Sequence, residues 1–239
     1  MFCLFLTFRH ADAGVAIDAG DRCAIADLVR SVPGVERSLL LTPAIANDRY
    51  YDDGPGPMLA MQVYFARLEA LEAAIAADGP LARIDARHFP ILRDAEGEHQ
   101  VMWARPFPVP PRDVPAGASR CAFMVHYHGA PEDANAWHDF YLRHHPAIMA
   151  TFPAIREIEV CTPVEWIDGS PWPRARHFQR NKIVFDDAAA LEQALNSPVR
   201  ERMKEDRDKF PPMSGGSVHQ PMRCETILGD EDGASSTVR

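Results

Sequence analysis

Apolar residues along the chain group into short runs, and each run has the spacing of either a strand or a helix. In the first half this spacing predicts strands at residues 2–8, 36–42, 59–65 and 98–104 and helices at 21–32 and 67–77. The helix at 67–77 has the clearest pattern, because Leu68, Leu71 and Ile75 share one helical face and Asp78-Gly79-Pro80 follows as a stop signal. In the second half, strands are predicted at 121–127, 155–161, 180–185 and 222–228, and helices at 135–151, 188–196 and 199–209.

The two halves are related by an internal repeat with an offset of about 120 residues. Leu41-Thr42-Pro43 recurs as Cys161-Thr162-Pro163, and Ala70-Leu71-Glu72 recurs as Ala190-Leu191-Glu192. A fixed internal period indicates that a structural unit is repeated. The chain is therefore predicted to contain one unit twice.

Each unit has the predicted order β-α-β-β-α-β, which is typical of the ferredoxin-like α+β fold, an antiparallel sheet with both helices on one face. The uncovered sheet faces must be buried, so we expect the two tandem units to pack as an internal dimeric α+β barrel, with the functional cavity between sheet and helices. The predicted organisation is a first copy at 1–105, a proline-rich linker at 106–119, a second copy at 120–228 and a disordered tail at 229–239.

Composition limits the partners of the protein. With 46% hydrophobic and 25% charged residues, the chain has the composition of a soluble globular protein, and no run approaches the roughly 18 apolar residues of a membrane helix. The net charge of −9, without a Lys/Arg cluster, argues against nucleic acid as a partner. The five cysteines form no C-x-x-C pair, and Met1 to Phe8 has the pattern of a strand rather than a signal peptide, so we expect a cytoplasmic protein with reduced thiols.

Histidines are concentrated in the second copy. Five of the ten lie in its first strand and helix, whereas the matching region of the first copy has only His10; the five are His126, His128, His138, His144 and His145. We therefore predict a structural first copy and a functional site in the second. His99 and His219 recur at matching positions of both copies, which favours a shared structural role for that pair.

The segment at 137–148 resembles the EthD family of dimeric α+β barrel proteins. In that family a helix rich in aromatic residues carries a histidine, one further residue, a proline and an apolar residue. Here His144-x-Pro146-Ala147 fills those positions, and Phe152-Pro153-Ala154 matches the proline-led turn that follows. The resemblance covers most of residues 120 to 228, and it implies a small cavity enzyme or binding protein that acts on aromatic or polyketide-like molecules without a cofactor.

Residue spacing assigns the candidate side chains to faces. On the predicted strand, His126 and His128 point to one side with Met124, because alternate residues share a face; the other side carries Phe123, Val125 and Tyr127. On the predicted helix, three- and four-residue spacing places His144 in a stripe of apolar neighbours, namely Trp137, Phe140, Tyr141 and Ile148. His145 lies about 100° away around the helix. We therefore expect His144, rather than His145, in the cavity.

A cavity histidine suits proton transfer, because its ordinary pKa of about 6.5 leaves both protonation states accessible. A positioned acid or base contributes typically 10²- to 10⁴-fold, which is enough for an activated carbon acid but not for an unactivated bond. We predict His144 as general acid or base, His126 and His128 on the opposing strand, and Tyr141 orienting a small aromatic or polyketide-like carbonyl compound. Dehydration, isomerisation, lactone opening and decarboxylation stay open, which favours a lyase or an isomerase.

Further residues are predicted to bind the substrate. His177, Gln179 and Asn181 alternate along a strand and would form a polar wall, since the first copy has the apolar Pro57, Leu59 and Met61 there. The other predicted substrate-binding residues are Trp137, His145 and two tryptophans of a proline-rich loop, Trp166 and Trp172. That loop is either a lid over an aromatic ligand or a loop anchored by buried indoles.

Other readings of the histidines stay open. A metal site would take His126, His128 and His144 as nitrogen ligands, with a carboxylate from Glu157, Glu159 or Glu165, and haem is a related alternative. A carrier or sensor would use the same cavity without turnover. We favour a site with no metal, since no H-E-x-x-H signature is present, and with no cofactor, since no nucleotide-binding loop is present either. The expected partner is a small molecule, and whether two chains pair as a homodimer stays open.

Overall fold

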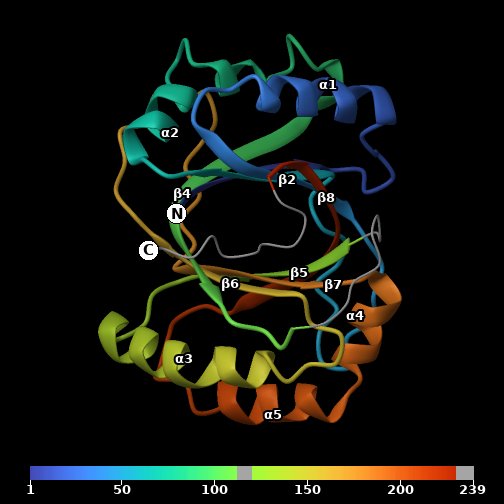
Figure 1. The fold of residues 1–239 in the computed structure, drawn as a ribbon, viewed down its shortest axis with the longest axis vertical. Helices are drawn as coiled ribbons and strands as arrows, with labels where there is room; N and C mark the ends of the chain where they lie inside the picture. Colours follow the sequence, from blue (N-terminus) through green and yellow to red (C-terminus); the bar gives the residue numbers. More distant parts are fainter. Residues whose placement is uncertain (112–119, 230–239) are drawn as a thin grey trace.

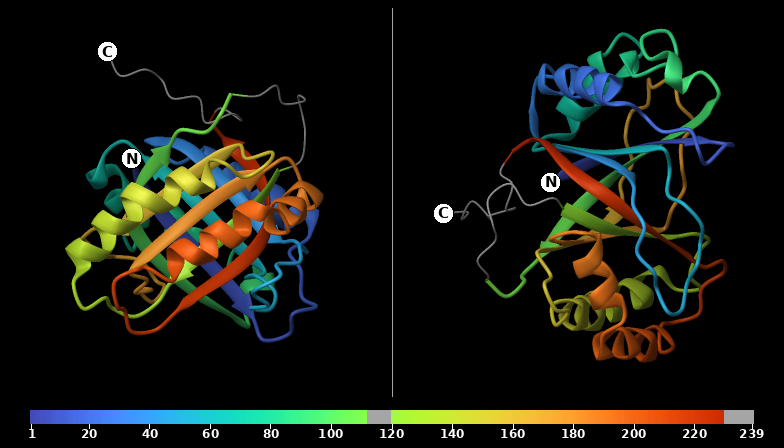
Figure 2. Two further views of the ribbon diagram at one scale, coloured as in Figure 1. Left: turned by 90° about the horizontal axis from the view of Figure 1, so that it is seen from below. Right: turned by 90° about the vertical axis from the view of Figure 1, so that its right-hand side faces the viewer.

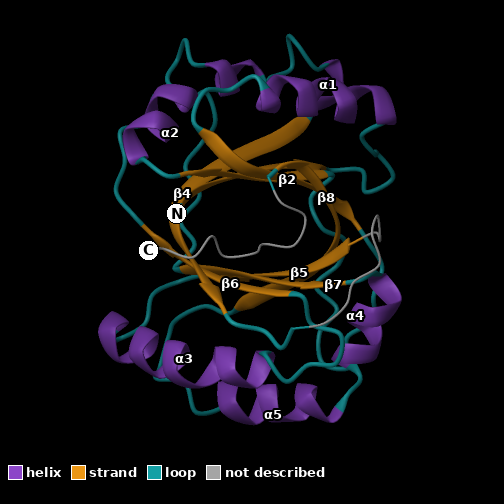
Figure 3. Ribbon diagram, viewed as in Figure 1, coloured by secondary structure: helices purple, strands orange, loops and turns teal. Residues whose placement is uncertain are grey.

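In the part of the chain that the structure describes, eight strands form a closed antiparallel barrel in the order β1-β3-β2-β8-β5-β7-β6-β4. Helices cover the barrel in two layers, with α1 and α2 on one side and α3, α4 and α5 on the other (Figure 1 and Figure 3). The structure is a computed structural model that describes residues 1–111 and 120–229. Residues 112–119 of the predicted linker and 230–239 of the predicted tail lie outside the described residues.

The elements predicted from residue spacing are all present, with shifted ends. The first half contains β1 (Phe2–His10), α1 (Ala19–Arg30), β2 (Val35–Pro43), β3 (Leu59–Phe65), α2 (Leu68–Ile75), two short 3-10 helices at Pro80–Arg83 and Pro90–Leu92, and β4 (Ala95–Phe107). The second half contains β5 (Arg120–Tyr127), α3 (Ala134–Met149), β6 (Glu157–Pro163), β7 (Gln179–Phe185), α4 (Ala188–Leu195), α5 (Pro198–Arg207) and β8 (Ser217–Leu228). No helix of the described residues has the length and apolarity to cross a membrane.

Strand order is the same in both halves. It runs β4-β1-β3-β2 in the first half and β8-β5-β7-β6 in the second. The halves join at two seams, where β2 pairs with β8 and β4 pairs with β6. At the second seam β4 continues into the predicted linker, since Phe107 still lies beside Ile158. The predicted α+β class and barrel are therefore confirmed, with all eight strands in one continuous barrel.

Alternation along the strands divides the buried side chains among three cores. In β5, Phe123 and Tyr127 face the helices of the second half, whereas Ala122 and Met124 face the barrel interior. The prediction that Met124 and Phe123 lie on opposite faces is therefore confirmed. The third core lies between the first-half sheet and its helices, and it contains Leu6.

The barrel interior also encloses a network of charged side chains. Lys182 is fully buried, and its Nζ lies 3.0 Å from the Glu157 carboxylate and donates to the Tyr64 hydroxyl at 2.8 Å. The Tyr64 hydroxyl donates to Glu159 at 2.8 Å, and Arg37 donates two hydrogen bonds to Glu157, at 2.8 and 2.7 Å. Because β2, β3, β6 and β7 each supply a member, the network joins the two halves across the barrel.

Two long loops cross between the halves. The first crossing loop, residues 44–58, leaves β2 and runs beside the second-half helices; the second crossing loop, residues 164–178, leaves β6 and runs to the first-half helices (Figure 2). Asp53 of the first loop lies 2.9 Å from the His219 ring, and Asp168 of the second lies 3.1 Å from the His99 ring. Each histidine is thus held by an aspartate from the opposite half, as a matching structural role predicts.

Candidate active site

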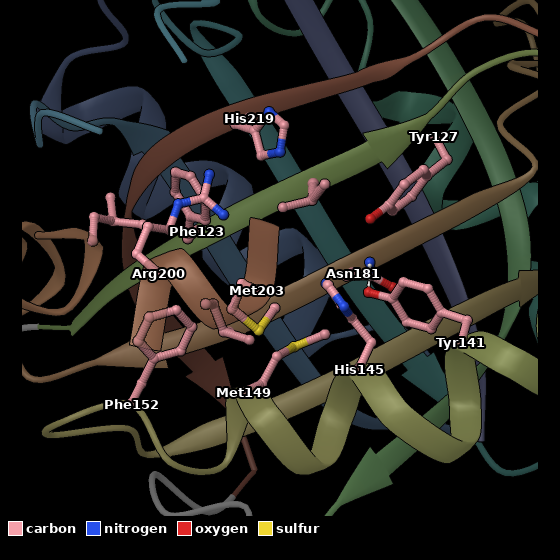
Figure 4. Close-up of a pocket in the computed structure, with 13 residues that line it drawn as sticks. Phe123, Tyr127, Tyr141, His145, Met149, Phe152, Asn181, Arg200, Met203 and His219 are labelled. Atoms are coloured by element: carbon pink, nitrogen blue, oxygen red, sulfur yellow. Dashed lines mark hydrogen bonds between the residues drawn. The ribbon is translucent and has the colours of Figure 1, made fainter. Parts of the chain in front are cut away.

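A cavity lies between the second-half sheet and helices α3 and α5. It contains about 400 Å³ of empty space, with its open mouth included. Strands, helices and the segment after α3 all contribute to its lining: Phe123, Val125, Tyr127, Tyr141, His145, Met149, Phe152, Asn181, Ile183, Leu195, Arg200, Met203 and His219 (Figure 4). The cavity occupies the place between sheet and helices where the fold prediction put it.

His145 is the cavity histidine of α3. Its side chain is 6% exposed, and its Nδ1 lies 2.7 Å from Oδ2 of Asp206, at the end of α5. Because a carboxylate only accepts, this contact assigns the proton of the neutral ring to Nδ1 and leaves Nε2 with a lone pair. Burial lowers the pKa of His145, although the hydrogen bond to Asp206 opposes that shift. The ring is therefore neutral near pH 7.

The prediction that His144 faces the cavity is wrong. His144 is exposed, and its Nδ1 lies 2.8 Å from the carbonyl oxygen of Phe140 in the preceding turn. The buried face of α3 instead repeats every four residues, through Trp137, Tyr141, His145 and Met149. After Tyr141, a three-residue and a four-residue step are both compatible with one helical face, and this helix takes the four-residue step.

Two tyrosines and an asparagine form a polar group beside His145. The Asn181 amide donates to the Tyr141 hydroxyl at 2.7 Å (Figure 4). Gln179 donates to the Asn181 side-chain oxygen at 3.0 Å. Burial raises the pKa of Tyr141 well above its usual value and raises the pKa of Tyr127 to about 12. Both hydroxyls therefore keep their protons and can donate to a ligand.

The other polar end of the cavity depends on the first crossing loop. His219 lines the cavity, and Tyr51 of the loop stacks on its ring at a centroid distance of 3.9 Å. Burial lowers the pKa of His219 to about 4, against the hydrogen bond to Asp53. Arg200 lines the same end and forms an ion pair with Asp48 of the loop. The first half therefore holds two lining side chains of the second-half cavity.

The matching region of the first half is filled by apolar side chains. Asn181 corresponds to Met61 in the repeat, and Met61 is 1% exposed in the core between the first-half sheet and helices. Ile25 and Val29 of α1 pack in that same core and are fully buried. In the described part of the chain, the polar groups of a sheet-helix cavity therefore belong to the second half, as the histidine distribution predicts.

His126 and His128 do not join Tyr141 in one site. His126 lines a separate cavity inside the barrel with Met124, on the opposite face of the sheet from Tyr141 and Asn181. His128 lies near the barrel end, where its ring is 4.8 Å from that of His177. The alternation of the strand was predicted correctly, but the cavity between sheet and helices lies on the other face.

The predicted polar wall is only partly formed. Asn181 lines the cavity, and Gln179 donates a hydrogen bond to the Asn181 side chain. His177 precedes β7 and lies 3.6 Å from Glu98 at the barrel end. His177 is outside the regular strand, so the two-residue alternation does not determine the direction of its side chain.

The predicted tryptophans lie outside the cavity lining. Trp137 is 1% exposed and stacks on Tyr141 at 5.0 Å between centroids, so it supports a lining residue from behind. Trp166 and Trp172 belong to the second crossing loop and pack against the first-half core beside His99. They anchor that loop, and the interpretation as a lid over the second-half cavity is wrong.

The three-histidine metal site is also not formed. His126 lies inside the barrel while His144 is exposed on α3, and Glu157 and Glu159 are paired with Lys182. Residues 1–111 and 120–229 contain no group of three or more His, Cys, Asp or Glu side chains arranged to hold a metal ion.

Several cavity residues were not predicted from the sequence. Asp206, Arg200 and Met203 are the buried residues of α5, a helix that was predicted without a functional role. Their three-residue spacing marks one face of that helix and was the available signal. Asp48 and Asp53 gave no signal, because a loop between two strands does not reveal that it crosses to the other half.

Comparison with known proteins identifies the fold of this chain, through similar solved structures. No family model matches the sequence, and no curated protein matches it. An anthrone oxidase-like protein is similar in structure, with a TM-score of 0.58 and 12% identity over 99% of this chain and 96% of that one. A "Putative monooxygenase" from Fusobacterium nucleatum subsp. nucleatum ATCC 25586 is similar with a TM-score of 0.61 and 9% identity over 97% and 95% of the two chains.

Two further similar structures are a chlorite dismutase-like protein and a member of the EthD family. A "Putative Chlorite dismutase" has a TM-score of 0.51 and 13% identity over 95% of both chains. The structures that match also include an EthD family protein from Bacillus halodurans C-125, which covers 43% of this chain at 20% identity with a TM-score of 0.34. The anthrone oxidase-like protein, the Fusobacterium protein and the chlorite dismutase-like protein each match at least 95% of this chain, and these three similarities identify its fold. The chain has the fold of the dimeric α+β barrel proteins, with both halves of the barrel on one polypeptide.

Proposed function

We propose that the second-half cavity binds a small aromatic or polyketide-like carbonyl compound and that His145 removes a proton from it. The observation that carries this proposal is the hydrogen bond between His145 and Asp206 at the cavity wall. Asp206 fixes the ring orientation and tautomer, so the Nε2 lone pair is available to a proton of the substrate. The lowered pKa of His145 keeps this base unprotonated at pH 7.

Removal of a proton next to a carbonyl group places negative charge on the carbonyl oxygen. Tyr127 and Tyr141 both line the cavity, and their protonated hydroxyls would donate to that oxygen. Asn181 holds the Tyr141 hydroxyl in place through its 2.7 Å hydrogen bond. These groups supply both a base and a charge-stabilising donor without a cofactor, as isomerisation, dehydration or eliminative lactone opening requires. In a decarboxylation the base has no proton to remove, and the donors alone would stabilise the enolate that forms as CO₂ leaves.

The remaining lining residues favour an apolar ligand body. Phe123, Phe152, Met149 and Met203 form much of the wall between the two polar ends. Aromatic and thioether side chains bind flat aromatic rings through dispersion and sulfur–aromatic contacts.

We also propose a division of roles between two tandem ferredoxin-like units, residues 1–105 and 120–228. The shared strand order and the repeated sequence support two such units. The first would stabilise the barrel and supply the first crossing loop, and the second would carry the reaction. All five cysteines are free thiols, which fits a cytoplasmic protein.

An oxygenase is a second candidate function. The anthrone oxidase-like protein and the Fusobacterium protein named as a monooxygenase share this fold over nearly the whole chain. An oxygenase would also need proton removal from an activated carbon before reaction with O₂. Measurement of dissolved O₂ during turnover separates the candidates, because a lyase or isomerase consumes none.

The test is a screen of aromatic lactones, β-hydroxy carbonyl compounds and polyketide-like acids with the purified protein, followed by absorbance and product analysis. The proposal expects turnover without added cofactor. Binding without turnover would assign a carrier. A haem absorbance band that is lost in His145→Ala would assign His145 as an iron ligand and overturn the acid–base proposal.

A further inference from the structure

A second cavity lies inside the barrel, on the opposite face of the sheet from His145. It contains about 270 Å³ of empty space with its mouth included. Its wall is largely apolar, with Phe5, Leu41, Met124 and Met222, but two cationic or basic side chains, Arg180 and His126, also line it. The proton-transfer site proposed above does not use this cavity.

Two buried polar atoms at this cavity lack a partner. Nδ1 of His126 and Nε of Arg180 are both inaccessible to solvent and make no hydrogen bond to any described residue. The two residues are 6% and 1% exposed, so bulk water does not compensate them. Buried polar groups in folded proteins are nearly always hydrogen-bonded, which points to a ligand or bound solvent at this position.

The chemistry of the two atoms defines what can bind. Arg180 Nε carries a hydrogen and can only donate, so the missing partner must be an acceptor. The neutral His126 ring can also donate from Nδ1, and burial together with the nearby Arg180 lowers its pKa well below the usual value. One acceptor with two oxygens could satisfy both donors.

The surrounding charges favour a single negative charge on the ligand. Arg180 lies 3.4 Å from Glu98, which also accepts from Thr7. Arg9 stands at the same end of the barrel and donates to Gln220, a lining residue. The His177 ring lies 5.3 Å from the His126 ring and 4.8 Å from the His128 ring, and His177 is also close to Glu98. Two arginines against one glutamate leave one unit of positive charge, since His126 is neutral.

We propose that the barrel cavity binds a small monocarboxylate, with its two oxygens accepting from Arg180 Nε and His126 Nδ1. The alkyl group would lie against Phe5 and Met124 on the apolar wall. This wall favours an organic acid over a fully hydrated inorganic anion, because apolar surface offers no hydrogen bonds to an inorganic ion. Phe5 already contacts Arg180, whose guanidinium lies 4.8 Å from the ring centroid.

The test uses acetate as the probe. Saturation-transfer NMR of its methyl protons, with chloride held constant, reports binding to the full-length wild-type protein and to His126→Leu and Arg180→Met. His144→Leu and Arg143→Met are the matched controls, because both residues are exposed on α3. We expect acetate to bind wild type and both controls, and each cavity variant to bind at least about tenfold more weakly, as loss of a hydrogen bond to a charged group implies.

A second measurement uses only the wild-type protein, so it tests the proposal even if a cavity variant fails to fold. In wild-type protein with ¹⁵N-labelled histidine, acetate should shift the His126 ring nitrogen signals, whereas chloride at the same concentration should not. Equal acetate binding by wild type and cavity variants, or no acetate-dependent shift at His126, overturns the proposal. An equal response to chloride would indicate a general anion site and would also overturn it.

Discussion

His144 and His145 are adjacent in α3 and have opposite environments. His144 is exposed and contacts the carbonyl oxygen of its own helix, while His145 is buried against Asp206 of a different helix. Charging the buried His145 ring costs desolvation, which lowers its pKa. Only the second histidine combines a fixed tautomer with access to a cavity, so His145 is the base that we propose.

Asp206→Asn tests the fixed tautomer. An asparagine amide can donate to Nδ1 and so favour the tautomer in which Nε2 carries the hydrogen. We expect kcat/KM to fall by up to about 10⁴-fold, the loss known when an aspartate that orients a catalytic histidine becomes asparagine. Asp208→Asn is the control, since Asp208 is exposed beside Arg207 and Lys204. Equal activity of Asp206→Asn and wild type would show that the pairing does not serve catalysis.

The pH dependence of activity tests the ionisation of His145. Burial lowers its pKa below the usual 6.5, so the unprotonated base persists to lower pH than for an exposed histidine. We expect kcat/KM to be constant near neutral pH and to fall only as the pH drops below 6.5. A midpoint at or above pH 6.5 in the kcat/KM profile would contradict this assignment.

At the scale of elements, the first crossing loop couples the halves through His219 and Asp53. The folded pKa of His219 is about 4 against 6.5 for a free ring, so between these values the unfolded state binds more protons. The free energy of unfolding contributed by this residue therefore falls as the pH drops from 6.5 to 4, by up to about 3 kcal/mol. Urea unfolding at pH 7 and pH 4.5 should show a smaller difference for His219→Phe than for wild type. An unchanged difference would mean that His219 is not buried beneath the loop.

The order of elements could be predicted from the sequence, but their exact faces could not. The two-residue period of β5 separates Met124 from Phe123 correctly, because a strand offers only two faces. In α3 the buried face could continue from Tyr141 to His144 or to His145, and the local pattern does not decide between them.

Local sequence patterns could not predict contacts between residues that lie far apart in the sequence. Asp206 meets His145 from 61 residues away, and Asp53 meets His219 from 166 residues away. Both pairs depend on how α5 and the first crossing loop pack on the second-half sheet. No periodicity in either segment encodes its partner, so these contacts required the three-dimensional fold.

For the molecule as a whole, we expect the stability of the barrel to depend on the charged side chains that are buried between its two halves. Lys182→Met would leave Glu157 and Glu159 without their shared cation inside the barrel. Breaking a buried pair by removing one partner costs about 3–5 kcal/mol, so we expect a loss of that size in the free energy of unfolding by urea. Lys209→Met, at an exposed position after α5, is the control and should change little. A stability equal to wild type would mean that the network does not hold the barrel together.

The role of His145 as general base is tested most directly by comparing His145→Gln with His144→Gln on the first substrate found by the screen. We expect His145→Gln to bind this compound and to lose about 10²- to 10⁴-fold in kcat, the usual contribution of a general base, while His144→Gln keeps wild-type turnover. Loss of turnover in His144→Gln with an active His145→Gln would contradict the account and would place the reaction on the outer face of α3.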